Sequence, residues 1–139
     1  MIVLVGESAS GKSSIEKYLV ENYDYNKIVS YTTREPRENE VDGIDYHFIS
    51  VEQFNKLKDE GFFAENATYR GWHYGIAKED CTNDKVAVLT PHGLRQVSKM
   101  NDIAVISFYI NVPRRDRLIK ILQRGDDIDE ACRRSLSDV

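Results

Sequence analysis

The chain has 139 residues, of which 41% are hydrophobic and 30% are charged. This size and composition predict one compact domain rather than a disordered chain. The formal net charge of −4 argues against a general nucleic-acid-binding protein. The sequence shows neither a basic leader nor an apolar run of membrane-spanning length, so we expect a cytoplasmic protein with no nucleic-acid or membrane partner. Its two cysteines, Cys81 and Cys132, are expected to be free thiols.

Short apolar segments alternate with helical patterns along most of the chain. The first five residues are wholly apolar and rich in β-branched side chains, which is typical of a strand buried on both faces. We expect strands over residues 1–5, 27–31, 85–90 and 103–112, and helices over 13–21 and from Pro91 onward. This alternation predicts an α/β domain whose parallel sheet is covered by helices on both faces.

Two segments depart from that alternation. Residues 31–75 are rich in Tyr, Arg, Glu and Gly and read as a small, partly β insertion. Within it, Ser50-Val-Glu-Gln53 predicts a capping box and a helix over 51–60, and Arg70-Gly71 predicts a hairpin turn. The charged tail, residues 114–139, reads as mostly helical with a break at 124–127.

The loop after the first strand carries the clearest chemical signal. Its sequence, Gly6-Glu-Ser-Ala-Ser-Gly11-Lys12-Ser13, matches the phosphate-binding P-loop and lies between an apolar strand and a helix. Backbone N–H groups and the helix N-terminus would bind phosphate oxygens, Lys12 would reach the β- and γ-phosphates, and the Ser13 hydroxyl would ligate Mg²⁺. We therefore predict that ATP binds at Gly6, Ser8, Ala9, Ser10, Gly11, Lys12, Ser13 and Ser14.

A second cluster follows at residues 30–48. Arg34 and Arg37 flank Pro36, and Tyr46 lies beyond a glycine. Arginine forks make paired hydrogen bonds to phosphate, so this cluster could hold a second phosphate, although its charge pattern alone also fits a solvated loop. Ser30-Tyr-Thr-Thr-Arg-Glu-Pro-Arg-Glu-Asn-Glu-Val-Asp-Gly-Ile-Asp-Tyr-His-Phe48 resembles the nucleoside-monophosphate-binding segment of guanylate kinases. Phe62-Phe-Ala-Glu65 and Tyr74-Gly75 are similar to further elements of that family.

The resemblance implies the fold, the reaction and the roles of individual residues. It implies a three-layer P-loop core (residues 1–30 and 76–113), a monophosphate-binding insertion (31–75) and a helical lid with its following helix (114–139). ATP would phosphorylate GMP, and also dGMP. The GMP-binding residues would be Ser30, Arg34, Arg37, Tyr46, Glu65, Tyr74 and Gly75. Glu65 would pair with the two adjacent donors of guanine.

An arginine-rich tail segment is similar to the lid that closes over ATP in guanylate kinases. It runs from Arg124-Gly-Asp-Asp to Arg134. Positioned arginines stabilise the charge of a transferring phosphoryl group. The predicted catalytic residues are Lys12, Arg34, Arg37, Arg124 and Arg134, with Arg117 and Arg133 as weaker candidates.

Three departures from the family pattern leave alternatives open. Ile76 stands where the family usually has Ser or Thr near guanine, and Val88 and Thr90 stand where it commonly has two aspartates. The chain also ends inside or just after the lid helix, whereas the family generally continues. We expect either a naturally minimal member or a truncated chain, and in the second case an apolar face could lie uncovered. A binding module without turnover and a kinase for another nucleoside monophosphate remain alternatives. We expect a monomer or a homodimer.

Overall fold

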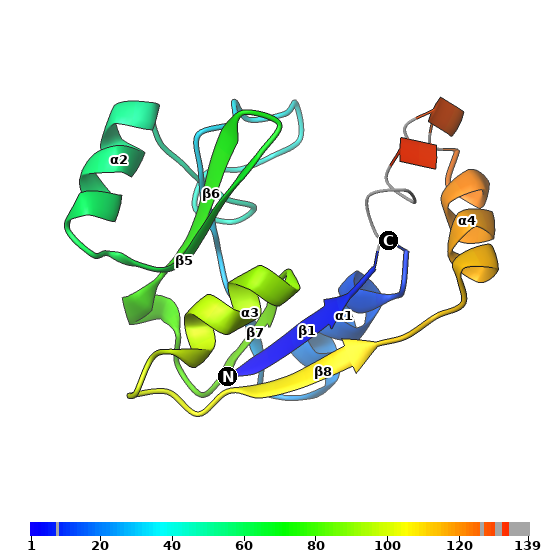
Figure 1. Ribbon diagram of the computed structural model, residues 1–139, viewed down its shortest axis with the longest axis horizontal. Coiled ribbons are helices and arrows are strands. Elements are labelled where there is room, and N and C mark those ends of the chain that lie inside the picture. The colour runs from blue at the N-terminus through cyan, green and yellow to red at the C-terminus, as the bar shows by residue number, and fades with distance from the viewer. Residues whose placement is uncertain (8, 126, 130–131, 134–139) are drawn as a thin grey trace.

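The computed structural model describes residues 1–7, 9–125, 127–129 and 132–133, and its core is a four-stranded parallel sheet (Figure 1). The strands lie in the order β2-β7-β1-β8. Their bounds are Ile2–Gly6 for β1, Asn26–Lys27 for β2, Lys85–Val88 for β7 and Ile106–Ile110 for β8. The predicted α/β fold with a parallel sheet is confirmed.

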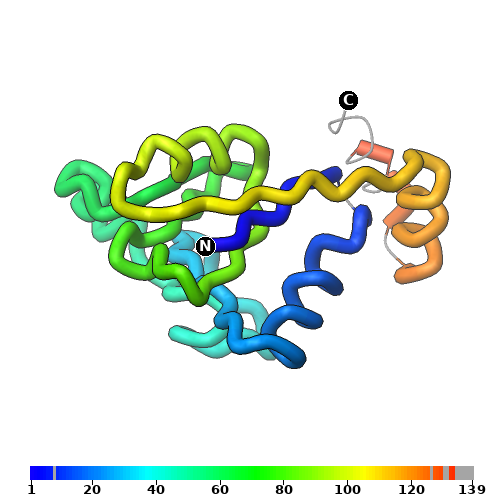
Figure 2. The backbone as a smooth tube through the Cα atoms, turned by 90° about the horizontal axis from the view of Figure 1, so that it is seen from below, coloured from blue at the N-terminus to red at the C-terminus, as the bar shows by residue number. Residues whose placement is uncertain are grey.

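Helices cover both faces of this sheet near β1 (Figure 2). They are α1 (Lys12–Asn22) and α3 (Pro91–Ser98). Side chains alternate between the two faces of a strand. Accordingly, Val3 and Val5 of β1 pack in one buried cluster with Val97 of α3, whereas the fully buried Leu4 lies outside that cluster. Pro91 occupies the first turn of α3, as its sequence position predicts.

A second four-stranded sheet rises from the core, in the order β4-β3-β6-β5. Its strands are β3 (Tyr31–Thr32), β4 (His47–Phe48), β5 (Phe63–Tyr69) and β6 (Trp72–Ala77), followed by a short 3₁₀ helix, η1 (Lys78–Asp80). The predicted hairpin is confirmed, since Arg70 and Gly71 both have positive φ and join β5 to β6. The predicted helix is also present, as α2 (Val51–Asp59), with both halves of its capping box formed.

Two strand predictions were wrong in detail. Residues 27–31 do not form one strand: β2 belongs to the core sheet and β3 begins the second sheet, because the chain passes from one sheet to the other at residues 28–30. The segment 103–112 forms the shorter strand β8, and the expected helical cover on both faces of the sheet does not extend to it. It is the edge strand of the core sheet, and Ile106, Phe108 and Tyr109 are each more than half exposed.

The last described helix, α4 (Arg114–Gln123), follows β8. In both views α4 and the second sheet lie at opposite ends of the molecule, with the core sheet between them (Figures 1 and 2). Cys81 is buried, Cys132 is exposed, and both are free thiols as predicted. Within the described residues, no helix is both long enough and apolar enough to cross a membrane.

Candidate active site

The glycine-rich loop leaves the carboxyl end of β1 and enters α1, at the edge of a parallel sheet where ligands bind in α/β folds. Ala9 and Gly11 have φ values of 59° and 94°, which turns successive backbone groups in the way that anion-binding loops require. Gly11 caps α1 without a side-chain hydrogen bond, so the N–H groups of the first helical turn face outward for a ligand.

Gly6 is required by a close approach between the loop and β8. A Cβ atom on residue 6 would lie 2.7 Å from the backbone oxygen of Ile110 and 2.8 Å from Ser10 Oγ. Lys12 folds back over the loop, and its Nζ donates a hydrogen bond to the carbonyl oxygen of Gly6. The lysine ammonium is therefore held at the loop, where a phosphate would lie.

An open cleft of about 510 Å³ lies beside this loop. It is lined by Ala9, Ser10, Gly11, Lys12, Ser13, Ser14, Lys120, Gln123 and Arg124. The cleft thus brings Arg124 together with most of the predicted ATP-binding residues. Ser8 and Arg134 fall outside the described residues. Sequence reasoning missed Lys120 and Gln123. Lys120 lies four residues before Arg124 on one helix, a spacing that could have indicated it, whereas no such signal points to Gln123.

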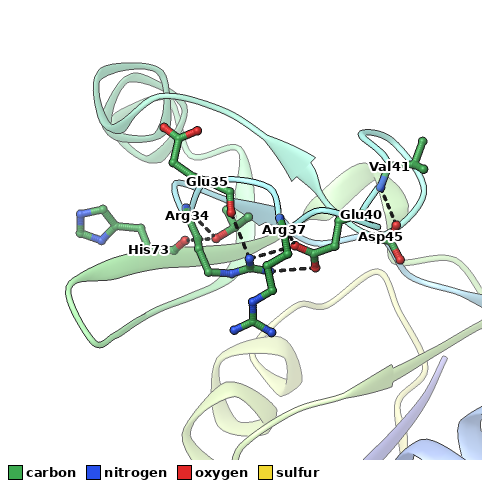
Figure 3. Close-up of polar contacts among 8 residues, drawn as sticks. Arg34, Glu35, Arg37, Glu40, Val41, Asp45 and His73 are labelled. Carbon is green, nitrogen blue, oxygen red and sulfur yellow. Dashed lines mark hydrogen bonds and ion pairs between the residues drawn. The ribbon is translucent and has the colours of Figure 1, made fainter.

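The predicted acceptor arginines differ in their surroundings (Figure 3). Arg34 is buried, and its two terminal nitrogens each donate to one oxygen of Glu40, at 2.9 Å. The hydrogen bonds from Arg34 and from the backbone N–H of Arg37 lower the pKa of Glu40 to about 2. The Arg37 side chain is exposed, and its guanidinium points away from Glu40. One arginine is therefore fixed in place, and the other extends toward solvent.

Two tyrosines surround Arg34. Its guanidinium lies over the ring of Tyr46, 5.3 Å from the centroid. Hydrogen bonding to Glu40 is the main cause of the raised pKa of Arg34, and a hydrogen bond to Tyr74 adds to it. The two tyrosine rings meet edge to face with centroids 6.0 Å apart. Strand register brings these parts together, because Thr32 of β3 pairs with Tyr74, and Gly75 pairs with Tyr31, next to Ser30. The second sheet thus gathers the predicted phosphate-binding residues.

Glu65 lies deeper in the same sheet and is only 7% exposed. Burial raises the pKa of its carboxyl to about 7. Helix α3 packs closely against it, because a Cβ on Gly93 would lie 3.1 Å from Glu65 Oε1. The side chain of Gln96 bonds both to the N–H and to the carbonyl oxygen of Asn66, each at 3.1 Å. Helix α3 therefore holds the part of β5 that carries Glu65, whose carboxyl group is desolvated.

The family model for guanylate kinase matches residues 1–138. The chain belongs to the guanylate kinase family. The guanylate kinase of Nitratidesulfovibrio vulgaris is 37% identical over 99% of this chain and 70% of its own length. That of Alkalilimnicola ehrlichii is 33% identical over 99% of this chain and 71% of its own length, and that of Bartonella henselae is 32% identical over 91% of this chain and 60% of its own length.

A solved structure agrees with this assignment. The crystal structure of guanylate kinase from Anaplasma phagocytophilum superposes with a TM-score of 0.66 at 26% identity, over 88% of this chain and 66% of that chain. This chain therefore spans between 60% and 71% of the length of these guanylate kinases.

The positions that depart from the usual guanylate kinase pattern have structural roles in this chain. Ile76 is 2% exposed and belongs to the buried cluster between β6 and the core sheet. It pairs in register with Glu65. Thr90 caps α3, since its hydroxyl accepts a hydrogen bond from the N–H of Gly93 at 3.1 Å. Val88 ends β7.

Phosphoryl transfer in the guanylate kinase family generally needs a divalent metal ion. Mg²⁺ keeps several waters and is commonly held by one or two protein ligands together with substrate phosphates. Ser13 lines the cleft at the start of α1 and would supply such a ligand. Among the described residues there is no group of three or more His, Cys, Asp or Glu side chains that could hold a metal.

Proposed function

We propose that this guanylate kinase transfers the γ-phosphoryl group of ATP to GMP, giving ADP and GDP, with the described residues in the roles set out below. The observation that carries the proposal is the pairing of two sites. One is a phosphate loop with cations facing a cleft, and the other is a sheet that holds a buried arginine and a buried glutamate. dGMP shares the phosphate and the base, so it would bind to the same residues.

The donor site is the cleft between the phosphate loop and α4. Backbone N–H groups of residues 9–14 bind the phosphates, Lys12 contacts the β- and γ-phosphates, and Arg124 neutralises charge from the opposite side. Lys120 lies on the same wall of the cleft and adds a positive charge there. Ser13 would hold Mg²⁺, which screens phosphate charge and orients the γ-phosphate when bound.

The acceptor site is the second sheet. Arg34, Tyr46 and Tyr74 bind the GMP phosphate together with Ser30 and Arg37. Glu40 keeps the guanidinium of Arg34 ordered before the substrate arrives, so less conformational entropy is lost on binding.

Glu65 recognises the guanine base of GMP. Its ionised carboxylate accepts hydrogen bonds from the adjacent N1–H and amine of guanine, which adenine cannot offer in the same arrangement. A buried site that hydrogen-bonds one base rejects another strongly, because its polar groups would be left unpaired. Gly75 lies beside Tyr74 on β6, where a side chain would collide with the ring of Phe63.

The transfer needs no general base, because the attacking oxygen of the GMP phosphate is already anionic. Catalysis consists of positioning and charge neutralisation. The described residues proposed to supply it are Lys12, Arg34, Arg37 and Arg124. Arg134, which lies outside the described residues, is proposed to join them from the resemblance alone. Because the second sheet and α4 lie at opposite ends of the molecule, the two substrates react only when the insertion and the lid close, which also excludes water. We place the reaction in the cytoplasm, where both nucleotides are found.

A coupled assay of ADP release tests this proposal against a panel of GMP, dGMP, AMP, CMP and UMP. We expect ADP release to depend on GMP and dGMP and to remain at background with the other three. ADP release that no acceptor accelerates would overturn the kinase assignment in favour of a binding module. Preference for another base would overturn only the role of Glu65.

A further inference from the structure

Arg117 is an unusual residue for its position in the fold. The three residues before it, Arg114, Arg115 and Asp116, are all exposed, yet Arg117 is only 6% exposed. Buried arginines in proteins are nearly always paired, because a desolvated charge without a partner is costly. The partners of Arg117 therefore indicate why the chain keeps a cation at this place.

Arg117 connects three segments that are far apart in sequence. Its guanidinium forms an ion pair with the carboxylate of Glu7, the residue that follows Gly6 in the phosphate loop. Its Nε donates a hydrogen bond to the carbonyl oxygen of Val112, at 3.1 Å, just after β8. The first residues of the loop, the end of the edge strand and α4 thus meet at one side chain.

The same helix carries the cations of the donor cleft. Lys120 and Arg124 lie three and seven residues after Arg117, and this spacing places all three on one side of a helix. Lys120 and Arg124 line the cleft together with residues 9–14 of the loop. A contact that fixes the first turn of α4 to the loop therefore also sets how these two cations face the phosphates.

Glu7 makes the pairing electrostatically important. Its carboxylate is about one-third exposed and belongs to the loop that would surround a polyanion. An unpaired carboxylate at this place would repel the triphosphate. The ion pair with Arg117 neutralises the Glu7 carboxylate and at the same time attaches α4 to the phosphate loop.

We infer that Arg117 is a positioning residue of the ATP site, whose ion pair with Glu7 holds α4 so that Lys120 and Arg124 face the triphosphate. The inference rests on the proposed function in taking ATP as the donor. It assigns Arg117 no contact with the nucleotide, in contrast to the lid role that its sequence position suggests.

The test is a double-mutant cycle on the Kd for MgATP, measured by calorimetry without GMP. Arg117→Met is made in the wild type and in a Lys120→Ala/Arg124→Ala background. We expect Arg117→Met to raise the Kd roughly tenfold in the wild type, as for partial loss of two charge-assisted contacts. In the background without the two cations, only the repulsion from the unpaired Glu7 carboxylate remains, so the Kd should rise by no more than about threefold. Arg115→Met, on an exposed position of the same helix, is the matched control and should change neither value.

Two further measurements separate positioning from a general structural effect. The Kd for GMP should stay unchanged in Arg117→Met, and Arg117→Lys should restore part of the ATP affinity. If Arg117→Met does not fold, Glu7→Gln breaks the same ion pair and replaces it in the cycle. Because this change also removes a negative charge beside the triphosphate, the inference then requires the Kd to change less favourably in the wild type than in the background without the two cations.

An equal rise of the Kd in both backgrounds, no rise at all, or a parallel loss of GMP affinity would overturn the inference. If the wild type binds MgATP but transfers no phosphate to GMP, the proposed function fails, whereas the cycle still decides the role of Arg117.

Discussion

The most specific prediction concerns the pH dependence of GMP binding. Glu65 is nearly enclosed, and burial raises its pKa to about 7. Only the ionised carboxylate can accept both guanine hydrogen bonds. Because this pKa is raised, the binding-competent form is lost as the pH falls through 7 and is fully present well above it.

The size of the effect follows from the pKa. With a pKa of about 7, roughly one carboxylate in eleven is ionised at pH 6, and roughly ten in eleven are ionised at pH 8. The Kd for GMP should therefore fall about tenfold between pH 6 and pH 8 from this group alone. Calorimetric titration of GMP without ATP measures this Kd independently of turnover.

A matched variant separates Glu65 from the substrate. The GMP phosphate itself has a second pKa near ~6, so part of any pH dependence comes from the ligand. Glu65→Gln retains that part and removes the carboxylate. We expect a higher Kd for GMP in this variant at pH 8. The ratio of its Kd values at pH 6 and pH 8 should be about tenfold smaller than that of the wild type. Identical pH dependence in the two proteins would refute the assignment of Glu65 as the residue that recognises guanine and whose ionisation controls GMP binding.

The same contacts determine the expected effect of four single substitutions. Glu65→Gln should raise the thermal stability at pH 8 and not at pH 4. The folded pKa of this carboxyl is about 7 rather than 4.5, so its ionised form lowers the free energy of unfolding by up to about 3 kcal/mol above pH 7 and by nothing below the unfolded pKa. Equal shifts of the melting temperature at both pH values would contradict this. Gly93→Ala should weaken GMP binding several-fold and leave the Kd for MgATP unchanged. The new Cβ would lie only 3.1–3.3 Å from atoms of the Glu65 side chain and would displace its carboxylate. Unchanged GMP affinity would show that the carboxylate can move without loss of binding. Lys12→Ala should abolish turnover and leave the Kd for GMP within about twofold, since the lysine lies at the donor loop; lost GMP affinity would place it elsewhere. Arg34→Ala should raise the Kd for GMP by about tenfold or more, as expected for a charge-assisted phosphate contact. An unchanged Kd would contradict the assignment of Arg34 to the acceptor site.

Local signals in the sequence predicted the parts of the fold that depend on near neighbours. The capping box at Ser50 and Gln53 and the turn at Arg70-Gly71 are set by hydrogen bonds and φ angles within a few residues. The phosphate loop is equally local, since its glycines act on their own backbone. Such features follow from a short window of sequence.

The features that sequence reasoning missed depend on contacts across the fold. Nothing near residue 7 in the sequence shows that Glu7 forms an ion pair with Arg117. The exposure of Phe108 has a similar origin, because an apolar strand pattern does not reveal whether the strand lies at the centre or the edge of a sheet.

A single-turnover experiment follows the proposed phosphoryl transfer itself. The enzyme is mixed with ATP labelled at the γ-phosphate, magnesium and excess GMP, and the label is followed in the products. We predict that the label appears in GDP with the wild type and that Lys12→Ala produces none. Label released as inorganic phosphate at the same rate with and without GMP would contradict the account, because the chain would then hydrolyse ATP rather than transfer its phosphoryl group.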